Sequence, residues 1–222
     1  MHRLLTEPDG KTTLYVGAEN WPLPIPLARA GNAWYFDSAA AKSEILYRQI
    51  GRNELSVIQI CGELVAAEKE YHAVAHDGAA QKEFAQKLQS SPGKHDGLYW
   101  PVAAGESPSP LVGPLLAAAE PQGSGEGAAS RTTPFYGYYF RILKAQGTHA
   151  PGGAESYLVN GKMTQGFALL AYPAVYRSTG VMTFLVGQDG VVYQKNLGRK
   201  TGEIAKSIQT YDPDPTWQEA EY

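Results

Sequence analysis

Three apolar segments separated by turn residues form the clearest pattern in this chain. Residues 167–172, 181–186 and 191–195 are rich in β-branched, aliphatic and aromatic residues, and Asp189-Gly190 stands between the last two. An Asp-Gly pair supplies the positive φ angles of a tight hairpin turn, and β-branched residues favour a pleated sheet. The pattern therefore predicts an antiparallel β-meander, and the aromatic residues 136–143 predict a further strand.

Helical patterns dominate the first half of the chain. Residues 39–50 are rich in helix formers, and Gly51 after them is typical of a helix end. Asn53 can cap a second and longer helix over residues 54–77, in which apolar positions recur at helical spacing. The polar residues 81–89 predict one more short helix.

The order of these elements indicates an α+β fold. The helix over residues 54–77 is expected to pack along one face of an antiparallel sheet that contains the meander. We predict a strand-strand-helix unit over residues 1–52 and a helix-plus-sheet domain over residues 53–222, with an irregular loop at 98–130. The strand expected at residues 11–16 has no evident partner before it, so we expect the natural protein to begin upstream of this sequence.

Composition removes several classes of function. The 222 residues are 43% hydrophobic and 18% charged, which is ordinary for a folded globular protein. The formal net charge is −3 and the basic residues are scattered, so no nucleic-acid partner is expected. No run approaches the ~20 apolar residues that span a bilayer, and the first residues do not form a secretory signal. The single cysteine, Cys61, excludes an intramolecular disulfide, and its place on the apolar stripe favours an inert buried thiol.

Glu68, His72 and His76 follow one another at intervals of four residues. On a helix they would share one face. Imidazole and carboxylate groups suit zinc or nickel, so the three residues are candidate metal ligands. The Glu of the metalloprotease motif is missing from between the histidines, and a solvated polar face is the alternative interpretation. No cofactor is expected from the sequence.

Four carboxylates in irregular loops leave a hydrolase open as an alternative. A glycosidase uses a pair of such groups, and the sequence does not show which of them pair. They are Asp96, Glu106, Glu120 and Glu126.

Aromatic residues on and near the strand at 136–143 form a candidate interaction surface. Tyrosine offers a large amphipathic contact area at a low cost in conformational entropy. The alternative is that about half of these residues belong to the core. The candidates are Tyr136, Tyr138 and Tyr157.

Several short motifs combine aromatic residues, proline and glycine. They are WPLPIPL at residues 21–27, WYFDSAA at 34–40, IGRNEL at 50–55, FYGYYFRIL at 135–143, and AYPAVY at 171–176 followed by GVMTF at 180–184. Together they resemble the bacterial domain of unknown function 2950 family over nearly the whole chain. That resemblance implies an exported protein, periplasmic or secreted, and it supplies no activity and no catalytic residues.

Two looser resemblances concern the fold alone. The first unit is similar to the end of a cystatin-like or nuclear transport factor two-like domain. The long helix followed by a meander is similar to the head of type IV pilins and pseudopilins, without the apolar anchor that those proteins carry.

These observations lead to a functional hypothesis and two alternatives. The chain is expected to be a non-enzymatic, extracytoplasmic interaction or structural protein with protein partners in the cell envelope. The first alternative is a hydrolase or metal-dependent enzyme whose site is assembled from distant loops. The second is a soluble accessory factor of a pilus or secretion system.

Overall fold

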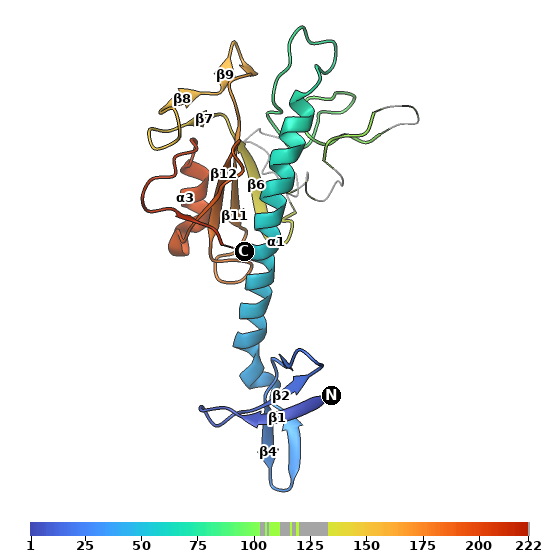
Figure 1. Cartoon of the computed structure of the whole chain (residues 1–222), viewed down its shortest axis with the longest axis vertical. Helices are drawn as coiled ribbons and strands as arrows, with labels where there is room; N and C mark the ends of the chain where they lie inside the picture. Colours follow the sequence, from blue (N-terminus) through green and yellow to red (C-terminus); the bar gives the residue numbers. More distant parts are fainter. Residues whose placement is uncertain (103–104, 106, 112–115, 117–118, 120–132, 222) are drawn as a thin grey trace. The chain divides into compact units, whose positions relative to one another are not determined.

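The computed structural model describes residues 1–102, 105, 107–111, 116, 119 and 133–221. The chain divides into two compact units, Met1–Arg52 and Asn53–Tyr222. Antiparallel sheets together with one long helix confirm the predicted α+β class (Figure 1). Most of the irregular loop expected at 98–130 lies outside the described residues, and the cystatin-like interpretation of the first unit stays a prediction.

The first unit holds an antiparallel sheet in the order β1-β2-β4-β5, with β3 paired to β2. The strand predicted at residues 11–16 is β2, and the expectation that it lacks a partner is wrong. β1 pairs with it along its full length, from His2 opposite Val16 to Thr6 opposite Thr12. The strands are β1 (His2–Thr6), β2 (Thr12–Val16), β3 (Trp21–Pro22), β4 (Leu27–Ala30) and β5 (Ala33–Phe36).

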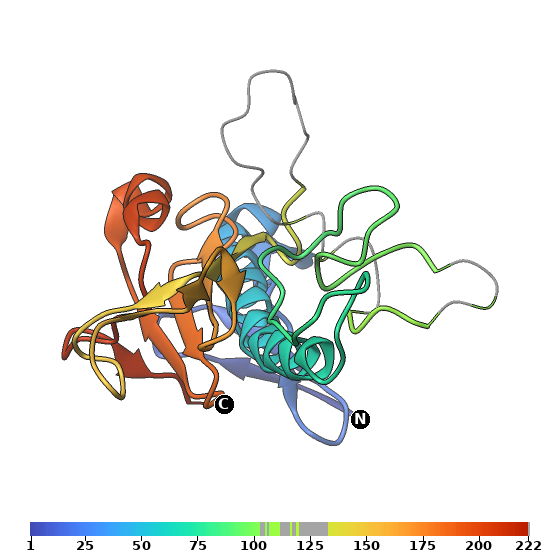
Figure 2. The same cartoon turned by 90° about the horizontal axis from the view of Figure 1, so that it is seen from above.

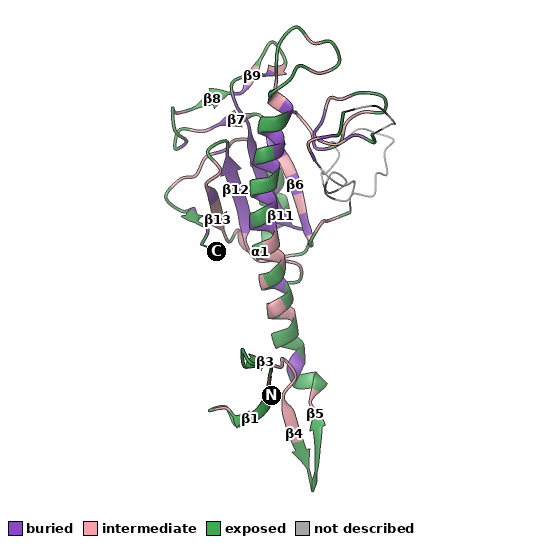
Figure 3. Ribbon diagram, turned by 45° about the vertical axis from the view of Figure 1, so that its right-hand side comes forward, coloured by how far each residue is buried: buried purple, intermediate pink, exposed green. Residues whose placement is uncertain are grey.

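Burial in this first unit is slight. Among its hydrophobic residues Ala41 and Ile50 are buried, whereas every residue of β1 and β5 is exposed (Figure 3). Its sheet therefore contributes little to a hydrophobic core.

One continuous helix, α1 (Ser38–His72), replaces the two helices that the sequence predicts. Asp37 is the residue before it, and its Oδ1 accepts the N–H of Ala40 at 3.0 Å, as a capping side chain does. The predicted break at Gly51 is wrong. The Nδ2 of Asn53 donates to the carbonyl oxygen of Thr179 at 2.8 Å instead of capping a helix. A glycine inside a helix costs only about 1 kcal/mol, so the flanking turns continue through it.

The chain after α1 departs from the prediction in two ways. The helix ends at His72 rather than at residue 77, and residues 81–89 are not helical. Backbone N–H groups in that stretch donate to distant acceptors. Phe84 donates to the carbonyl of Met163 at 2.7 Å, and Ala85 donates to the Glu68 carboxylate at 2.9 Å. These tertiary bonds occupy donors that a helix would need.

The second unit is built on a five-stranded antiparallel sheet in the order β14-β13-β12-β11-β6, which confirms the predicted meander. Two short hairpins and a short helix accompany it. The sheet strands are β6 (Tyr138–Leu143), β11 (Ala168–Pro173), β12 (Thr183–Gly187), β13 (Val192–Lys195) and β14 (Gln218–Glu219). The other elements are β7 (Ala145–Gln146), β8 (Glu155–Ser156), β9 (Leu158–Val159), β10 (Lys162–Met163), η1 (Gly198–Lys200) and α3 (Thr201–Ser207).

Both faces of this sheet are covered. Successive side chains of a strand point to opposite faces. Tyr138 of β6 reaches the α1 side, where its hydroxyl lies 3.4 Å from Oε1 of Glu54. Arg141 faces the other side and donates to the carbonyl of Ala205 in α3 at 2.8 Å. Viewed from above, the sheet lies between α1 and α3 (Figure 2), which explains why every residue of β11 and β12 is buried.

The carboxylate of Glu54 fixes α1 to the sheet. Its Oε1 accepts the backbone N–H groups of Val181 at 2.7 Å and of Met182 at 2.9 Å.

Within the described residues, no helix has both the length and the apolar character that crossing a membrane requires.

Candidate functional site

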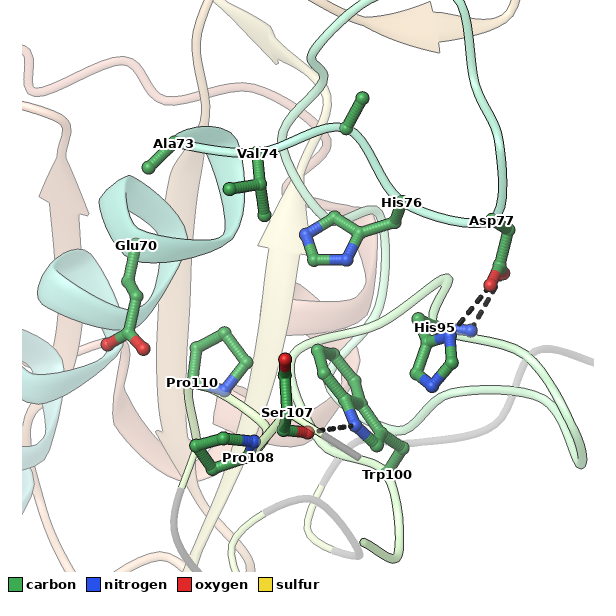
Figure 4. Close-up of a pocket in the computed structure, with 11 residues that line it drawn as sticks. Glu70, Ala73, Val74, His76, Asp77, His95, Trp100, Ser107, Pro108 and Pro110 are labelled. Carbon is green, nitrogen blue, oxygen red and sulfur yellow. Dashed lines mark hydrogen bonds and ion pairs between the residues drawn. The ribbon is translucent and has the colours of Figure 1, made fainter. Parts of the chain in front are cut away.

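A pocket of about 620 Å³ lies where the chain leaves the C-terminal end of α1 (Figure 4). Its wall combines small apolar side chains and prolines with a tryptophan, two histidines and two carboxylates. The residues that line it are Glu70, Ala73, Val74, Ala75, His76, Asp77, His95, Trp100, Ser107, Pro108 and Pro110.

The last turn of α1 and the residues that follow it form one side of this pocket. The last helical residue, His72, stacks on Phe84 with ring centroids 4.1 Å apart. Asp77 then adopts a left-handed backbone with φ 50°, and Gly78 follows with φ 73°. Asp tolerates this region better than most residues, and Gly adopts it freely. The chain reverses there, and residues 78–94 form a loop that returns to Asp77.

Asp77 closes that loop on His95. Its Oδ2 accepts the backbone N–H of His95 at 2.8 Å, and its Oδ1 lies 2.7 Å from Nδ1 of the same residue. These two bonds from His95 lower the pKa of Asp77, so the carboxylate is ionised at neutral pH. A third bond runs from the Tyr71 hydroxyl to the His95 carbonyl at 2.6 Å. His95 is thus held at its backbone on both sides and at one ring nitrogen.

His76 is fixed in a different way. Its ring stacks on Tyr71 with centroids 4.0 Å apart and 19° between the planes. Its Nε2 lies 3.0 Å from the backbone carbonyl oxygen of Tyr71. A carbonyl oxygen can only accept, so this nitrogen carries the proton in the bond.

Trp100 joins the two histidines. The residue is 5% exposed, and its ring lies edge-to-face with both imidazoles, with centroid distances of 5.6 Å to His76 and 4.7 Å to His95. Its Nε1 donates to the backbone carbonyl of Ser107 at 3.3 Å. The tryptophan therefore forms a fixed wall, because its polar atom is bonded and its ring is packed.

The predicted metal ligands are not brought together. Glu68 is fully buried, and its Oε2 accepts the N–H of Ala85. His72 stacks on Phe84, and His76 lies beyond the end of the helix and so does not share its face. Within the described part of the chain, no three His, Cys, Asp or Glu side chains are grouped as a metal site would require. The helical spacing misled because α1 ends before His76.

The candidate interaction surface loses two of its three tyrosines. Tyr138 is 0% and Tyr157 2% exposed, because each packs in the core and uses its hydroxyl there. Tyr138 donates to the carbonyl of Met182 at 2.9 Å, and Tyr157 donates to Oε1 of Gln146 at 2.9 Å. Tyr136 is exposed, and an aromatic contact surface stays a prediction for that residue.

The other candidates have simpler outcomes. Burial raises the pKa of the Cys61 thiol to about 12, so it stays protonated and unreactive at neutral pH. Asp96 pairs with Nζ of Lys87 at 2.8 Å. The remaining carboxylates considered for a hydrolase, Glu106, Glu120 and Glu126, lie outside the described residues.

Sequence reasoning missed the residues that the pocket brings together. Asp77, His95 and Trp100 belong to no periodic pattern, because a loop joins them. One signal was present. The tripeptide His-Asp-Gly occurs at residues 76–78 and again at 95–97, at the two ends of that loop.

A second Asp–His pair makes the same two contacts, but through a single carboxylate oxygen. Asp212 Oδ1 accepts the backbone N–H of His149 at 2.8 Å and lies 3.0 Å from its Nδ1. Neither residue lines the pocket at the end of α1.

Comparison with known proteins places the chain in a family. The family model described as "Protein of unknown function (DUF2950)" matches residues 1–220. The chain belongs to this family. No curated protein and no solved structure matches it.

Proposed function

We propose that this member of the DUF2950 family is a non-enzymatic binding protein, and that the pocket at the end of α1 holds its ligand. The observation that carries the proposal is the pocket itself. Ligand sites are typically concave, about 300 to 1,000 Å³ in volume, and apolar with a few placed polar groups. The pocket has that volume and that composition.

Rigid walls favour binding because little ordering is required when the ligand enters. The bonds of His95 to Asp77 and to Tyr71 fix the loop that supplies one wall. Trp100 fixes the other through its ring contacts and its bond to Ser107.

A pair of matched variants tests the proposal. Val74 lines the pocket and is 54% exposed, whereas Val175 is 55% exposed and does not line it. We expect Val74→Phe to fill the pocket and Val175→Phe to leave it unchanged. Each protein is titrated with benzylamine, benzyl alcohol and benzoate while the side-chain NMR signals of His76 and Trp100 are followed.

The proposal requires at least one probe to move these signals saturably in the natural protein and in Val175→Phe but not in Val74→Phe. Signals that respond to no probe, or that respond equally in Val74→Phe, would contradict it.

The pair Asp77–His95 favours a second candidate function, a hydrolase. An Asp bonded to Nδ1 leaves Nε2 of the histidine as a base that can take a proton from water. A turnover screen over esters, glycosides and phosphates tests this candidate. Activity that is lost in Asp77→Asn and kept in Asp212→Asn would support it, and a screen without turnover would remove it.

We also propose that the protein acts outside the cytoplasm, with partners in the cell envelope. The resemblance of its motifs to an exported family supports this location. Fusion of alkaline phosphatase to the C-terminus of the natural gene product tests it, because that enzyme is active only after export. An inactive, stable fusion would contradict the proposal.

A further inference from the structure

The histidine that Asp77 holds lines the pocket and has one acceptor nitrogen. The ionised Asp77 can only accept, so Nδ1 of His95 carries the proton in their bond. In neutral imidazole the other nitrogen then has a lone pair and no proton. Figure 4 shows that this second nitrogen lies on the side of the ring away from Asp77.

The second histidine presents an acceptor for the same reason. Nε2 of His76 donates to the carbonyl of Tyr71, so Nδ1 is the unprotonated nitrogen of the neutral ring. Two rings with independent partners therefore share one property. Each has one nitrogen that donates to the protein, and no hydrogen bond within the described residues occupies its acceptor nitrogen.

The charged residues of the pocket also favour a ligand that donates hydrogen bonds and carries positive charge. Among the described residues that line it, Glu70 and Asp77 are acidic and none is Lys or Arg. Both oxygens of Asp77 bind His95, whereas Glu70 is exposed and forms no ion pair within the described residues. Glu70 and His95 lie at opposite sides of the pocket, with Pro110 and Trp100 between them (Figure 4).

We propose that this pocket binds an organic cation that carries N–H donors on an apolar body, such as an aromatic or alkyl amine. The ammonium group donates to the histidine acceptors and is attracted by the carboxylate of Glu70, and the apolar body lies against Trp100 and the prolines. Charge-assisted hydrogen bonds are roughly twice as strong as neutral ones. This inference rests on the proposed function of the pocket as a ligand site.

Three probes of similar size separate the charge from the shape. Benzylamine is a cation at neutral pH, benzyl alcohol is neutral and benzoate is an anion. We expect benzylamine to bind the complete chain about tenfold more tightly than benzyl alcohol, and benzoate more weakly than both. Affinities are measured from the saturation of the Trp100 signal.

A charge-removing variant identifies the group responsible. Glu70→Gln keeps the shape of the side chain, and we expect it to weaken benzylamine about two- to fivefold without changing benzyl alcohol. Glu63→Gln is the matched control, since Glu63 is exposed on α1 two turns earlier and does not line the pocket. Glu63→Gln should change neither affinity.

The outcomes distinguish this inference from the proposal on which it rests. Benzyl alcohol or benzoate binding as tightly as benzylamine would overturn the cation preference and leave the pocket as a ligand site. Equal losses in Glu70→Gln and Glu63→Gln would also overturn it. Failure of all three probes to bind would remove both proposals together.

Discussion

The two Asp–His pairs of this protein join the same groups, but Asp77 uses both carboxylate oxygens whereas Asp212 uses Oδ1 alone, and their surroundings differ. In each, an aspartate accepts the backbone N–H and lies against Nδ1 of one histidine, at 2.8 and 2.7 Å for Asp77 and at 2.8 and 3.0 Å for Asp212. His95 lies against Trp100 in a pocket, and its carbonyl is bonded to Tyr71.

The second pair joins two segments of the chain. Next to Asp212, the carbonyl of Tyr211 accepts the N–H of Gly147 at 2.8 Å. Gly147 lies two residues before His149, so the same two segments are bonded at both places. His149 is exposed. Because both pairs connect two segments of the chain, an Asp–His hydrogen bond by itself indicates a structural link and not a functional site. The aromatic wall and the second histidine are what make the first pair part of a candidate site.

The largest effect is expected from the aromatic wall. Trp100→Ala should lower the free energy of unfolding by about 3 to 5 kcal/mol, because it removes a buried ring and leaves a cavity. Trp34→Ala, at a ring that is 53% exposed, should change it by less than about 0.5 kcal/mol. Urea denaturation measures both. Equal effects would mean that Trp100 is not a structural wall.

A smaller effect is expected from the Tyr71 hydroxyl. Tyr71→Phe removes the donor to the carbonyl of His95 and should cost about 1 to 2 kcal/mol, while His149 keeps its bonds. Tyr47→Phe, at an exposed side chain, is the control. Thermal unfolding gives the stability, and a cost no greater than that of the control would show that this bond does not distinguish the two pairs.

Removing each carboxylate compares the pairs directly. Asp77→Asn and Asp212→Asn should each cost less than about 1 kcal/mol of stability, because solvent screens exposed pairs. Their effects on benzylamine binding should differ. Asp77→Asn should weaken it, since an amide donor favours the tautomer of His95 that lacks an acceptor toward the ligand. Equal weakening in Asp212→Asn would remove the difference between the pairs.

The smallest effect is expected on the stability of the fold at low pH. Hydrogen bonds from His95 lower the pKa of Asp77 in the folded protein. A carboxylate with a lowered pKa contributes stability above its unfolded value of about 3.9, and that contribution is lost as pH falls through the folded pKa. Asp77→Asn should therefore lose less stability than the natural protein between about pH 4 and pH 2. A greater acid loss in the variant would contradict this sign.

The sheet could be predicted from the sequence because its signals are local. Short runs rich in β-branched, aliphatic and aromatic residues, joined by an Asp-Gly turn, specify β12 and β13 without reference to distant residues. The break expected at Gly51 failed because Asn53 and Glu54, which suggest a helix start, bond to residues more than 120 positions away. Asn and Glu are typical of a helix start and also bond to distant backbone groups. A single sequence does not show which of the two roles such a residue has.

The candidate site could not be predicted for a related reason. Its parts come from the end of a helix and from loops, where side-chain direction follows no period. The candidates that did follow a period, Glu68 and His72, are buried in or packed against the body of the second unit. A helical period identifies residues on one side of α1. Most residues of the pocket follow the end of α1 at His72, where that period no longer applies.

A titration that follows three histidines at once shows whether the pocket at the end of α1 binds an amine. The chain, with its histidine rings labelled for NMR, is titrated with benzylamine at neutral pH, and His149 serves as an internal control. We expect the signals of His76 and His95 to move together and saturate while that of His149 stays in place. A response of His149 equal to that of His95, or no response of either pocket histidine, would contradict it.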